Sequence, residues 1–263
     1  MGGIDLENLY SVAGKTVLVT GGVSGIGRML SGAFVAAGAR VYITGRQPGA
    51  LAEAVAELGA IGTVFGIHAD LGSPDGVAAI TEELGLRQAH LDVLINNAGQ
   101  TWGAPFGEFP SKAWSPVMTV NVQVPFALAQ GLLPLLEAGA TEASPARIIN
   151  IGSVYAETTE VMNAYSYTAS KAAIHQLTRV MAHDLAPRRI LVNAIAPGLF
   201  PSKMTHFVLK NDTARDALLK AIPLGRAGTP EDIAGLAMFL CSRAGSYITG
   251  AIIPIDGGIL IAH

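Results

Sequence analysis

The chain has 263 residues, of which 50% are hydrophobic and only 14% are charged, and its formal net charge is −3. This composition excludes a disordered or fibrous chain, and the 17 scattered basic residues give no footprint for nucleic acid or an anionic membrane. A single cysteine, Cys241, excludes an internal disulfide. The first ten residues lack the basic start and apolar run of a signal peptide, and we expect a cytoplasmic protein.

Short β-branched apolar runs alternate with longer segments of helical period, which is typical of βαβ units that build a parallel sheet. The predicted strands are Thr16–Thr20, Arg40–Thr44, Thr63–His68, Val93–Asn96, Arg147–Ile151, Ile190–Ala194 and Ala251–Ile255. The predicted helices are Gly25–Ala37, Pro48–Leu58, Ser73–Leu86, Ser111–Leu136, Tyr165–Ala186 and Pro230–Cys241. We expect a single α/β domain over residues 1–263, with a doubly wound sheet of seven parallel strands and helices on both faces.

Residues 199–222 form an unusually long connection between the last two predicted strands. Apolar residues such as Phe200 and Phe207 mix there with polar ones. Long insertions near strand ends often form lids or walls of a binding site, so we predict a substrate lid here. A plain surface helix is the alternative.

The first predicted strand leads into a glycine turn, Gly21-x-x-x-Gly25-x-Gly27, and helical periodicity follows directly. Such a turn brings backbone N–H groups close to a pyrophosphate, and the helix N-terminus adds unpaired donors and partial positive charge. The spacing differs from the commoner G-x-G-x-x-G fingerprint, and a plain tight turn is the alternative. A Walker A loop is excluded because Leu9 stands five positions before Gly14, where that motif needs a glycine.

The second predicted strand ends in Thr44-Gly45-Arg46. A fold that prefers NAD places an acid at this position to accept from the ribose 2′-OH. No carboxylate stands here, and the Arg46 guanidinium can pair with the 2′-phosphate of NADP. We therefore predict NADP(H), with NAD(H) as the alternative cofactor and a solvated turn arginine as the competing interpretation.

Tyr167 and Lys171 are four residues apart, on one face of the predicted helix that begins at Tyr165. A neighbouring lysine favours a phenolate, so we expect the pKa of Tyr167 to lie below its usual value. An exposed i,i+4 pair is the alternative. Ser153 follows a buried strand and should lie at the carboxyl edge of the sheet, where ligands of such folds bind. A serine nucleophile is disfavoured because Tyr155 occupies the second glycine position of the G-x-S-x-G elbow.

Further motifs occur in order along the chain: Asn96-Asn-Ala-Gly99, Asn121, Pro197-Gly198, Ile248-Thr-Gly250 and Asp256-Gly-Gly258. With these, the sequence resembles the short-chain dehydrogenase/reductase family, which has a Rossmann fold, from about Gly14 to Gly258. The resemblance implies that Tyr167 is the acid/base and that Lys171 lowers its pKa and binds the nicotinamide ribose. It also implies that Ser153 holds the substrate oxygen and that Asn121 anchors a proton-relay water.

The resemblance also implies a set of cofactor contacts, with Asp70 beside the adenine and Ser202 near the nicotinamide carboxamide. The whole set is Gly21, Ser24, Gly25, Ile26, Gly27, Arg46, Asp70, Leu71, Asn97, Ala98, Gly99, Tyr167, Lys171, Pro197, Gly198 and Ser202. We predict no metal site, because the six histidines and one cysteine form neither H-E-x-x-H nor C-x-x-C. A homo-oligomer, tetramer or dimer, follows by analogy with the family.

The sequence therefore predicts an NADP(H)-dependent enzyme that reduces a carbonyl to a secondary alcohol. Within the family the chain looks most like the NADPH-dependent 3-oxoacyl reductases, those of rhamnolipid biosynthesis in particular, which suggests a 3-oxoacyl or similarly apolar ketone. The alternatives are a dehydrogenase of a sugar, polyol or steroid alcohol, and a dinucleotide sensor without catalysis.

Overall fold

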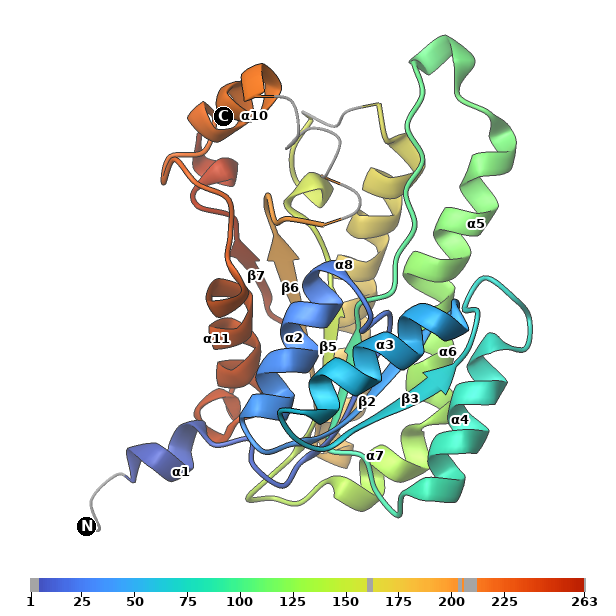
Figure 1. Cartoon of the computed structure of the whole chain (residues 1–263), viewed down its shortest axis with the longest axis vertical. Coiled ribbons are helices and arrows are strands. Elements are labelled where there is room, and N and C mark those ends of the chain that lie inside the picture. Colours follow the sequence, from blue (N-terminus) through green and yellow to red (C-terminus); the bar gives the residue numbers. More distant parts are fainter. Residues whose placement is uncertain (1–4, 160–162, 203–204, 206–211, 263) are drawn as a thin grey trace.

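The computed structural model describes residues 5–159, 163–202, 205 and 212–262. Its centre is a parallel sheet in the order β3-β2-β1-β4-β5-β6-β7 (Figure 1). The strands are β1 (Thr16–Val19), β2 (Arg40–Gly45), β3 (Val64–His68), β4 (Val93–Asn96), β5 (Ala146–Ile151), β6 (Ile190–Pro197) and β7 (Ile252–Ile255). The predicted doubly wound seven-stranded Rossmann fold is confirmed.

Helices cover both faces of the sheet. The main ones are α2 (Gly25–Ala36), α3 (Pro48–Gly59), α4 (Gly76–Arg87), α5 (Trp114–Met118), α6 (Val124–Gly131), α7 (Leu133–Gly139), α8 (Tyr165–Leu185), α10 (Asp212–Lys220) and α11 (Pro230–Cys241). One apolar cluster joins the sheet to α2, α3 and α11, and a second joins it to α4, α6, α7 and α8. Successive strand residues alternate between the two: Val17 and Val19 belong to the first cluster and Leu18 to the second.

The predicted helix Ser111–Leu136 is wrong as a single element. The segment Ser111–Gly131 and the following α7 are bent by 59° relative to each other, and a π-turn, η3 (Thr119–Gln123), interrupts the first piece. Pro125 and Pro134 fall in the first turns of α6 and α7, and neither has the N–H that a continuous helix needs. The prolines therefore divide one apolar run into three short helices.

Smaller differences lie at element ends. The structure adds a short helix, α1 (Leu6–Tyr10), whose N-cap Asp5 accepts a hydrogen bond from the Asn8 N–H at 3.2 Å. Strand β6 continues to Pro197, three residues beyond the prediction. None of the helices in the described part of the chain is long and apolar enough by itself to cross a membrane, although the bent pair meets the length and composition criteria together.

The topology fixes the place of the site. The chain runs outward from β1 through β2 to β3, then returns to place β4 on the other side of β1. The connections after β1 and β4 therefore leave the sheet in opposite directions. Such a switch point opens a crevice at the carboxyl edge of the sheet, where open α/β folds bind their ligands.

Candidate active site

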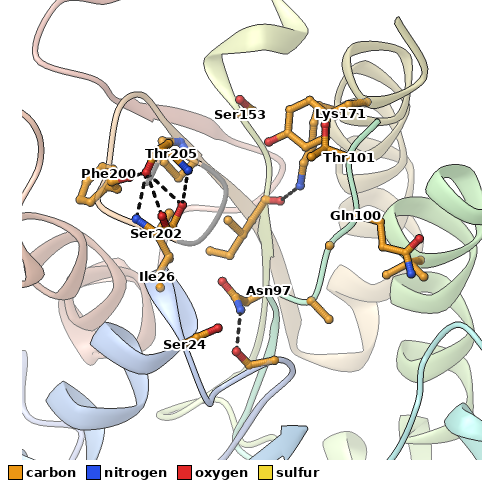
Figure 2. A pocket seen from close by; sticks show the side chains of 18 of the residues that line it. Ser24, Ile26, Asn97, Gln100, Thr101, Ser153, Lys171, Phe200, Ser202 and Thr205 are labelled. Carbon is orange, nitrogen blue, oxygen red and sulfur yellow. Dashed lines mark hydrogen bonds between the residues drawn. The ribbon is translucent and has the colours of Figure 1, made fainter. Parts of the chain in front are cut away.

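A cleft of about 530 Å³ lies at this switch point. Figure 2 shows Ser24 and Ile26 at the start of α2 at one end of the pocket, with Ser153 and Lys171 farther along it. The cleft volume falls within the range of ordinary ligand pockets. The predicted residues that line it are Gly21, Ser24, Gly25, Ile26, Arg46, Asp70, Leu71, Asn97, Ala98, Gly99, Ser153, Tyr167, Lys171, Pro197, Gly198 and Ser202.

Two predicted residues lie outside the lining. A Cβ at Gly27 would stand 2.4 Å from both Asn97 Nδ2 and the Gly21 carbonyl oxygen, so this glycine lets α2 pack against the turn. Asn121 is 2% exposed and belongs to η3, behind the wall of the cleft. Neither residue lines the cleft, and the cofactor contact predicted for Gly27 and the water-anchoring role predicted for Asn121 stay predictions.

The glycine turn is built as a tight backbone cradle. Gly21 and Gly25 have φ values of +65° and +55°, which side-chain-bearing residues rarely adopt. Asn97 Nδ2 donates to the Thr20 carbonyl oxygen at 2.9 Å, and Gly21 N–H donates to Thr44 Oγ1 at 3.1 Å. These bonds tie the turn to the ends of β2 and β4.

Helix α2 opens directly onto the cleft. Its N-cap, Ser24, makes no side-chain capping bond, and Ser24, Gly25 and Ile26 all line the pocket. The first N–H groups of a helix have no intrahelical acceptor, and the helix dipole adds partial positive charge there. An uncapped helix start on a glycine turn fits the pyrophosphate of a dinucleotide.

The far end of the cleft is lined by Thr44, Gly45, Arg46 and Asp70. A Cβ at Gly45 would stand 2.8 Å from Val23 Cγ1, so a larger residue at that position requires the Val23 side chain to move. Asp70 Oδ1 accepts the Gly72 N–H at 2.9 Å, which closes the turn after β3. Arg46 is exposed at the rim and, among the residues that the structure describes, is the one basic residue at this end of the lining.

Three side chains meet where β5 ends. Tyr167 hydrogen-bonds to the Ser153 side chain, and Ser153 Oγ also accepts the Tyr155 N–H at 3.2 Å. Lys171 Nζ donates to the Ile151 carbonyl oxygen at 2.6 Å and lies 5.5 Å from the centre of the Tyr167 ring. The structure thus brings together the serine, the phenol and the amine that the sequence places on two separate segments.

The expected lowering of the Tyr167 pKa is not found. Burial raises the pKa of this phenol above its usual value, and the hydrogen bond to Ser153 only partly opposes the effect. Burial also lowers the pKa of Lys171 to about 8. The amine bonds to a backbone carbonyl rather than to the phenol, so removal from water outweighs its charge.

Asn121 organises the site from behind. Its Oδ1 accepts the Gln100 N–H at 2.8 Å, and its Nδ2 donates to the Gln100 carbonyl oxygen and to Ser170 Oγ, each at 2.9 Å. Ser170 Oγ in turn donates to the Tyr167 carbonyl oxygen at 2.6 Å. Asn121 therefore joins the loop after β4 to the helix that carries Tyr167.

Described residues of the segment predicted as a lid add apolar side chains to the lining of the cleft. Leu199, Phe200 and Leu218 line the pocket together with Ser202 and Thr205. Thr205 Oγ1 accepts the Ser202 N–H at 2.9 Å and donates to the Phe200 carbonyl oxygen at 2.7 Å (Figure 2). The remainder of the segment, 203–204 and 206–211, lies outside the described residues.

Two residues in the site were not predicted. Tyr155 lines the cleft two positions after Ser153, and His175 is buried against the same loop. In the sequence, Tyr155 breaks the G-x-S-x-G elbow, and its place two residues after Ser153 is the signal that points to the cleft. His175 falls one helical turn after Lys171, but that spacing by itself names no chemistry.

A family model described as "Enoyl-(Acyl carrier protein) reductase" matches residues 21–260. The chain belongs to the short-chain dehydrogenase/reductase family. Its sequence is 46% identical to the rhamnolipids biosynthesis 3-oxoacyl-(acyl-carrier-protein) reductase of Pseudomonas aeruginosa, over 95% of this chain and 97% of that protein. It is 36% identical to gluconate 5-dehydrogenase of Gluconobacter oxydans, over 97% of this chain and 98% of that protein.

A solved structure, described as the Pseudomonas aeruginosa RhlG/NADP active-site complex, is similar to the whole fold. It superposes with a TM-score of 0.94 at 45% sequence identity, covering 96% of this chain and 99% of that one. The expected resemblance to the 3-oxoacyl reductase of rhamnolipid biosynthesis is therefore confirmed, and the chain is an oxidoreductase of the short-chain type.

Proposed function

We propose that this protein reduces a carbonyl group, of the 3-oxoacyl type or another apolar ketone, to a secondary alcohol with NADP(H). The observation that carries the proposal is the hydrogen-bonded pair of Ser153 and Tyr167, with Lys171 beside it, in the same cleft as the uncapped start of α2. The similarity to a 3-oxoacyl reductase and to a structure solved with NADP supports it.

The residues present fit a dinucleotide cofactor, which when bound supplies the hydride for the carbonyl carbon. The glycine turn and the start of α2 would hold its pyrophosphate, and Asp70 its adenine end. Arg46 would pair with the 2′-phosphate, which favours NADP(H) over NAD(H). Lys171 would hold the nicotinamide ribose, and Ser202 would lie near the carboxamide.

Tyr167 is the proposed proton donor. Its raised pKa keeps the phenol protonated at neutral pH, which suits transfer of that proton to the substrate oxygen during reduction. The Ser153 and Tyr167 hydroxyls polarise the carbonyl from one side. Lys171, with a pKa of about 8, is mostly protonated at neutral pH and stabilises the phenolate that the transfer leaves. Asn121 would anchor the water that returns a proton to this pair.

The apolar wall made by Leu199, Phe200 and Leu218 favours a substrate with a hydrocarbon portion. A sugar-acid or polyol dehydrogenase is the second candidate, because gluconate 5-dehydrogenase is among the relatives. An assay of 3-oxoacyl thioesters, simple ketones and keto-sugar acids with NADPH separates the two. Turnover limited to the sugar acids would refute the first candidate.

The test of the catalytic assignment is Tyr167→Phe, which removes one hydroxyl and keeps the ring. We expect kcat to fall by a factor of about 10³ or more, since one donor and one proton source are lost together, while the NADPH dissociation constant stays near its wild-type value. Steady-state kinetics and fluorescence titration with NADPH measure both. The control is Tyr247→Phe, a fully exposed tyrosine far along the chain. Normal turnover by Tyr167→Phe would refute the role assigned to Tyr167, and a wild-type protein that binds NADPH but turns over no substrate would favour the non-catalytic sensor.

We also propose that residues 1–263 form one catalytic domain in which 199–222 acts as a substrate lid. We propose that the chain forms a homo-oligomer, a tetramer or a dimer. The exposed apolar residues Trp114, Phe126 and Val180 on α5, α6 and α8 support this.

A cytoplasmic location is proposed because the single cysteine, Cys241, is buried and free. Recovery of the chain in a membrane or secreted fraction after cell fractionation would contradict that location.

A further inference from the structure

One face of α8 contacts three consecutive residues at the end of β5, Ile151 to Ser153. Tyr167, Lys171 and His175 follow one another at four-residue intervals, so their side chains leave the same side of the helix. Tyr167 bonds to the Ser153 side chain. Lys171 Nζ donates to the Ile151 carbonyl oxygen, which is the bond drawn at Lys171 in Figure 2. The backbone N–H of Ser153 donates to His175 Nε2 at 3.5 Å. The first two contacts belong to the proposed catalytic group, and the third has no role in it.

The imidazole fits this place closely. His175 is 3% exposed, and a Cβ at Gly152 would stand 2.1 Å from its Nε2 and 2.7 Å from its Cδ2. Gly152 cannot retreat, because its own N–H donates to the Ile195 carbonyl oxygen on β6 at 2.7 Å. The glycine before the catalytic serine is thus required by the ring that packs on it.

Burial, together with two neighbouring cations, keeps His175 neutral. Burial, Lys171 and Arg179 lower the pKa of the imidazole to about 4. Glu157, on the segment after η4 (Val154–Ala156), has its Oε1 3.5 Å from His175 Nδ1. Since Nε2 accepts from Ser153, the proton of the neutral ring belongs on Nδ1, facing this carboxylate. One tautomer therefore satisfies both neighbours.

His175 does not line the cleft, so it cannot act on a substrate directly. What it can do is hold the backbone from which the Ser153 hydroxyl projects. A displacement of the serine by about 1 Å from its partner can cost a factor of 10² in rate. The contact of His175 with the Ser153 backbone therefore affects the geometry of the contact between Tyr167 and the Ser153 side chain.

We propose that His175, as a neutral imidazole with its proton on Nδ1, is a positioning residue that keeps Ser153 in register with Tyr167. Gly152 is the matching position, because it leaves room for the ring. The proposal rests on the proposed reduction, but the tautomer and the packing of residues 152 and 175 can be tested without any substrate.

The first test compares His175→Leu with His175→Gln, whose amide oxygen can accept the Ser153 N–H where Nε2 does. We expect His175→Leu to lower kcat by roughly 10- to 100-fold with an unchanged NADPH dissociation constant, and His175→Gln to restore most of the loss. His183→Leu, an exposed histidine eight residues later on the same helix, is the matched control. Equal kcat in the leucine and glutamine variants would overturn the proposal.

The second test separates positioning from simple space filling. Gly152→Ala should lower the denaturation midpoint, because the new methyl group meets the imidazole. Adding His175→Ala should recover the midpoint by removing the clash, but kcat should stay low because the Ser153 N–H has lost its acceptor. Recovery of kcat together with stability would show that the ring only fills space, and failure to recover the midpoint would contradict the proposed packing.

The third test uses ¹⁵N NMR of the histidine rings, with the His175 signals assigned by their loss in His175→Gln. We expect Nε2 to be unprotonated and Nδ1 protonated, with no titration until the pH falls toward about 4. A proton on Nε2 at neutral pH would overturn the proposal whatever the enzyme reduces. If wild-type protein reduces no carbonyl while the tautomer and the recovered midpoint are as expected, the proposed function fails and the packing inference stands.

Discussion

Arg46 shows how much depends on one side chain at the edge of the cleft. It follows Gly45, the last residue of β2, where a Cβ would meet the Val23 side chain and where the chain has no carboxylate. The guanidinium is exposed and forms the rim of the adenine end. In the proposed binding mode, a dinucleotide with an additional phosphate at the 2′ position would gain a charge-assisted bond there, and one without it would not.

We therefore expect Arg46→Ala to lower the preference for NADPH over NADH by roughly 10- to 100-fold, the range of a hydrogen bond to a charged group. The loss should appear in KM for NADPH, with kcat little changed, because the 2′-phosphate lies far from the reacting atoms. The ratio of kcat/KM for the two cofactors measures it. Arg40→Ala, an exposed arginine at the other end of β2, is the control. An unchanged ratio would remove Arg46 from cofactor selection.

The residues that sequence reasoning found are those whose chemistry requires a fixed residue type at a fixed spacing. Tyr167 and Lys171 can be recognised by their four-residue spacing. The glycine turn can be recognised because a strand precedes it and a helix follows it. His175 carries no such signal, because its partner is a backbone N–H on another segment. The pKa of Tyr167 was mispredicted for a related reason: spacing shows which charge is near but not how much water has been removed.

The elements differ in how well the sequence predicts them. Strands β1, β4 and β5 are buried along their whole length, so continuous apolar runs locate them directly. Helices α5 to α7 share one apolar run, and hydropathy alone cannot tell a first-turn proline from an interior one. The interruption between α5 and α6 is the π-turn η3, which contains Asn121. The Asn121 side chain accepts the Gln100 N–H and donates to the Gln100 carbonyl oxygen. An interruption of the helix thus lies where the site needs a polar anchor.

Helix α10 gives an element-scale test of the proposed lid. Leu218 lines the cleft and its neighbour Leu219 does not. Replacing Leu218 with alanine removes apolar contact worth about 1 to 2 kcal/mol if the substrate chain covers it. We expect Leu218→Ala to raise KM by roughly 5- to 30-fold for a ten-carbon 3-oxoacyl thioester and far less for a four-carbon one.

We also expect the NADPH dissociation constant of Leu218→Ala to be unchanged, because the proposed lid contacts the substrate and not the cofactor. Leu219→Ala is the matched control, one residue away on the same helix. Equal effects on short and long substrates, or an effect of equal size in the control, would contradict the assignment of 199–222 as a lid for an acyl chain.

At the scale of the whole molecule, the two helical layers are not equivalent. The layer of α2, α3 and α11 contributes the start of α2 to the cleft, while the other layer carries Asn121 on η3 and Tyr167 on α8. The outer face of this second layer keeps Trp114, Phe126 and Val180 41%, 46% and 48% exposed. Large apolar side chains on neighbouring helices of one layer are typical of a surface that another subunit covers.

We expect Phe126→Glu to dissociate the proposed oligomer, because a carboxylate in the middle of an apolar interface loses its hydration without gaining a partner. Sedimentation equilibrium should show the mass falling from a multiple of the chain mass to that of one chain. Leu86→Glu is the control, since Leu86 is 89% exposed at the end of α4. Because α8 also carries Tyr167 and Lys171, the dissociated variant should lose thermal stability and part of its turnover together. A variant that keeps the wild-type mass would place the subunit contact elsewhere, and a wild-type protein of one-chain mass would refute the oligomer.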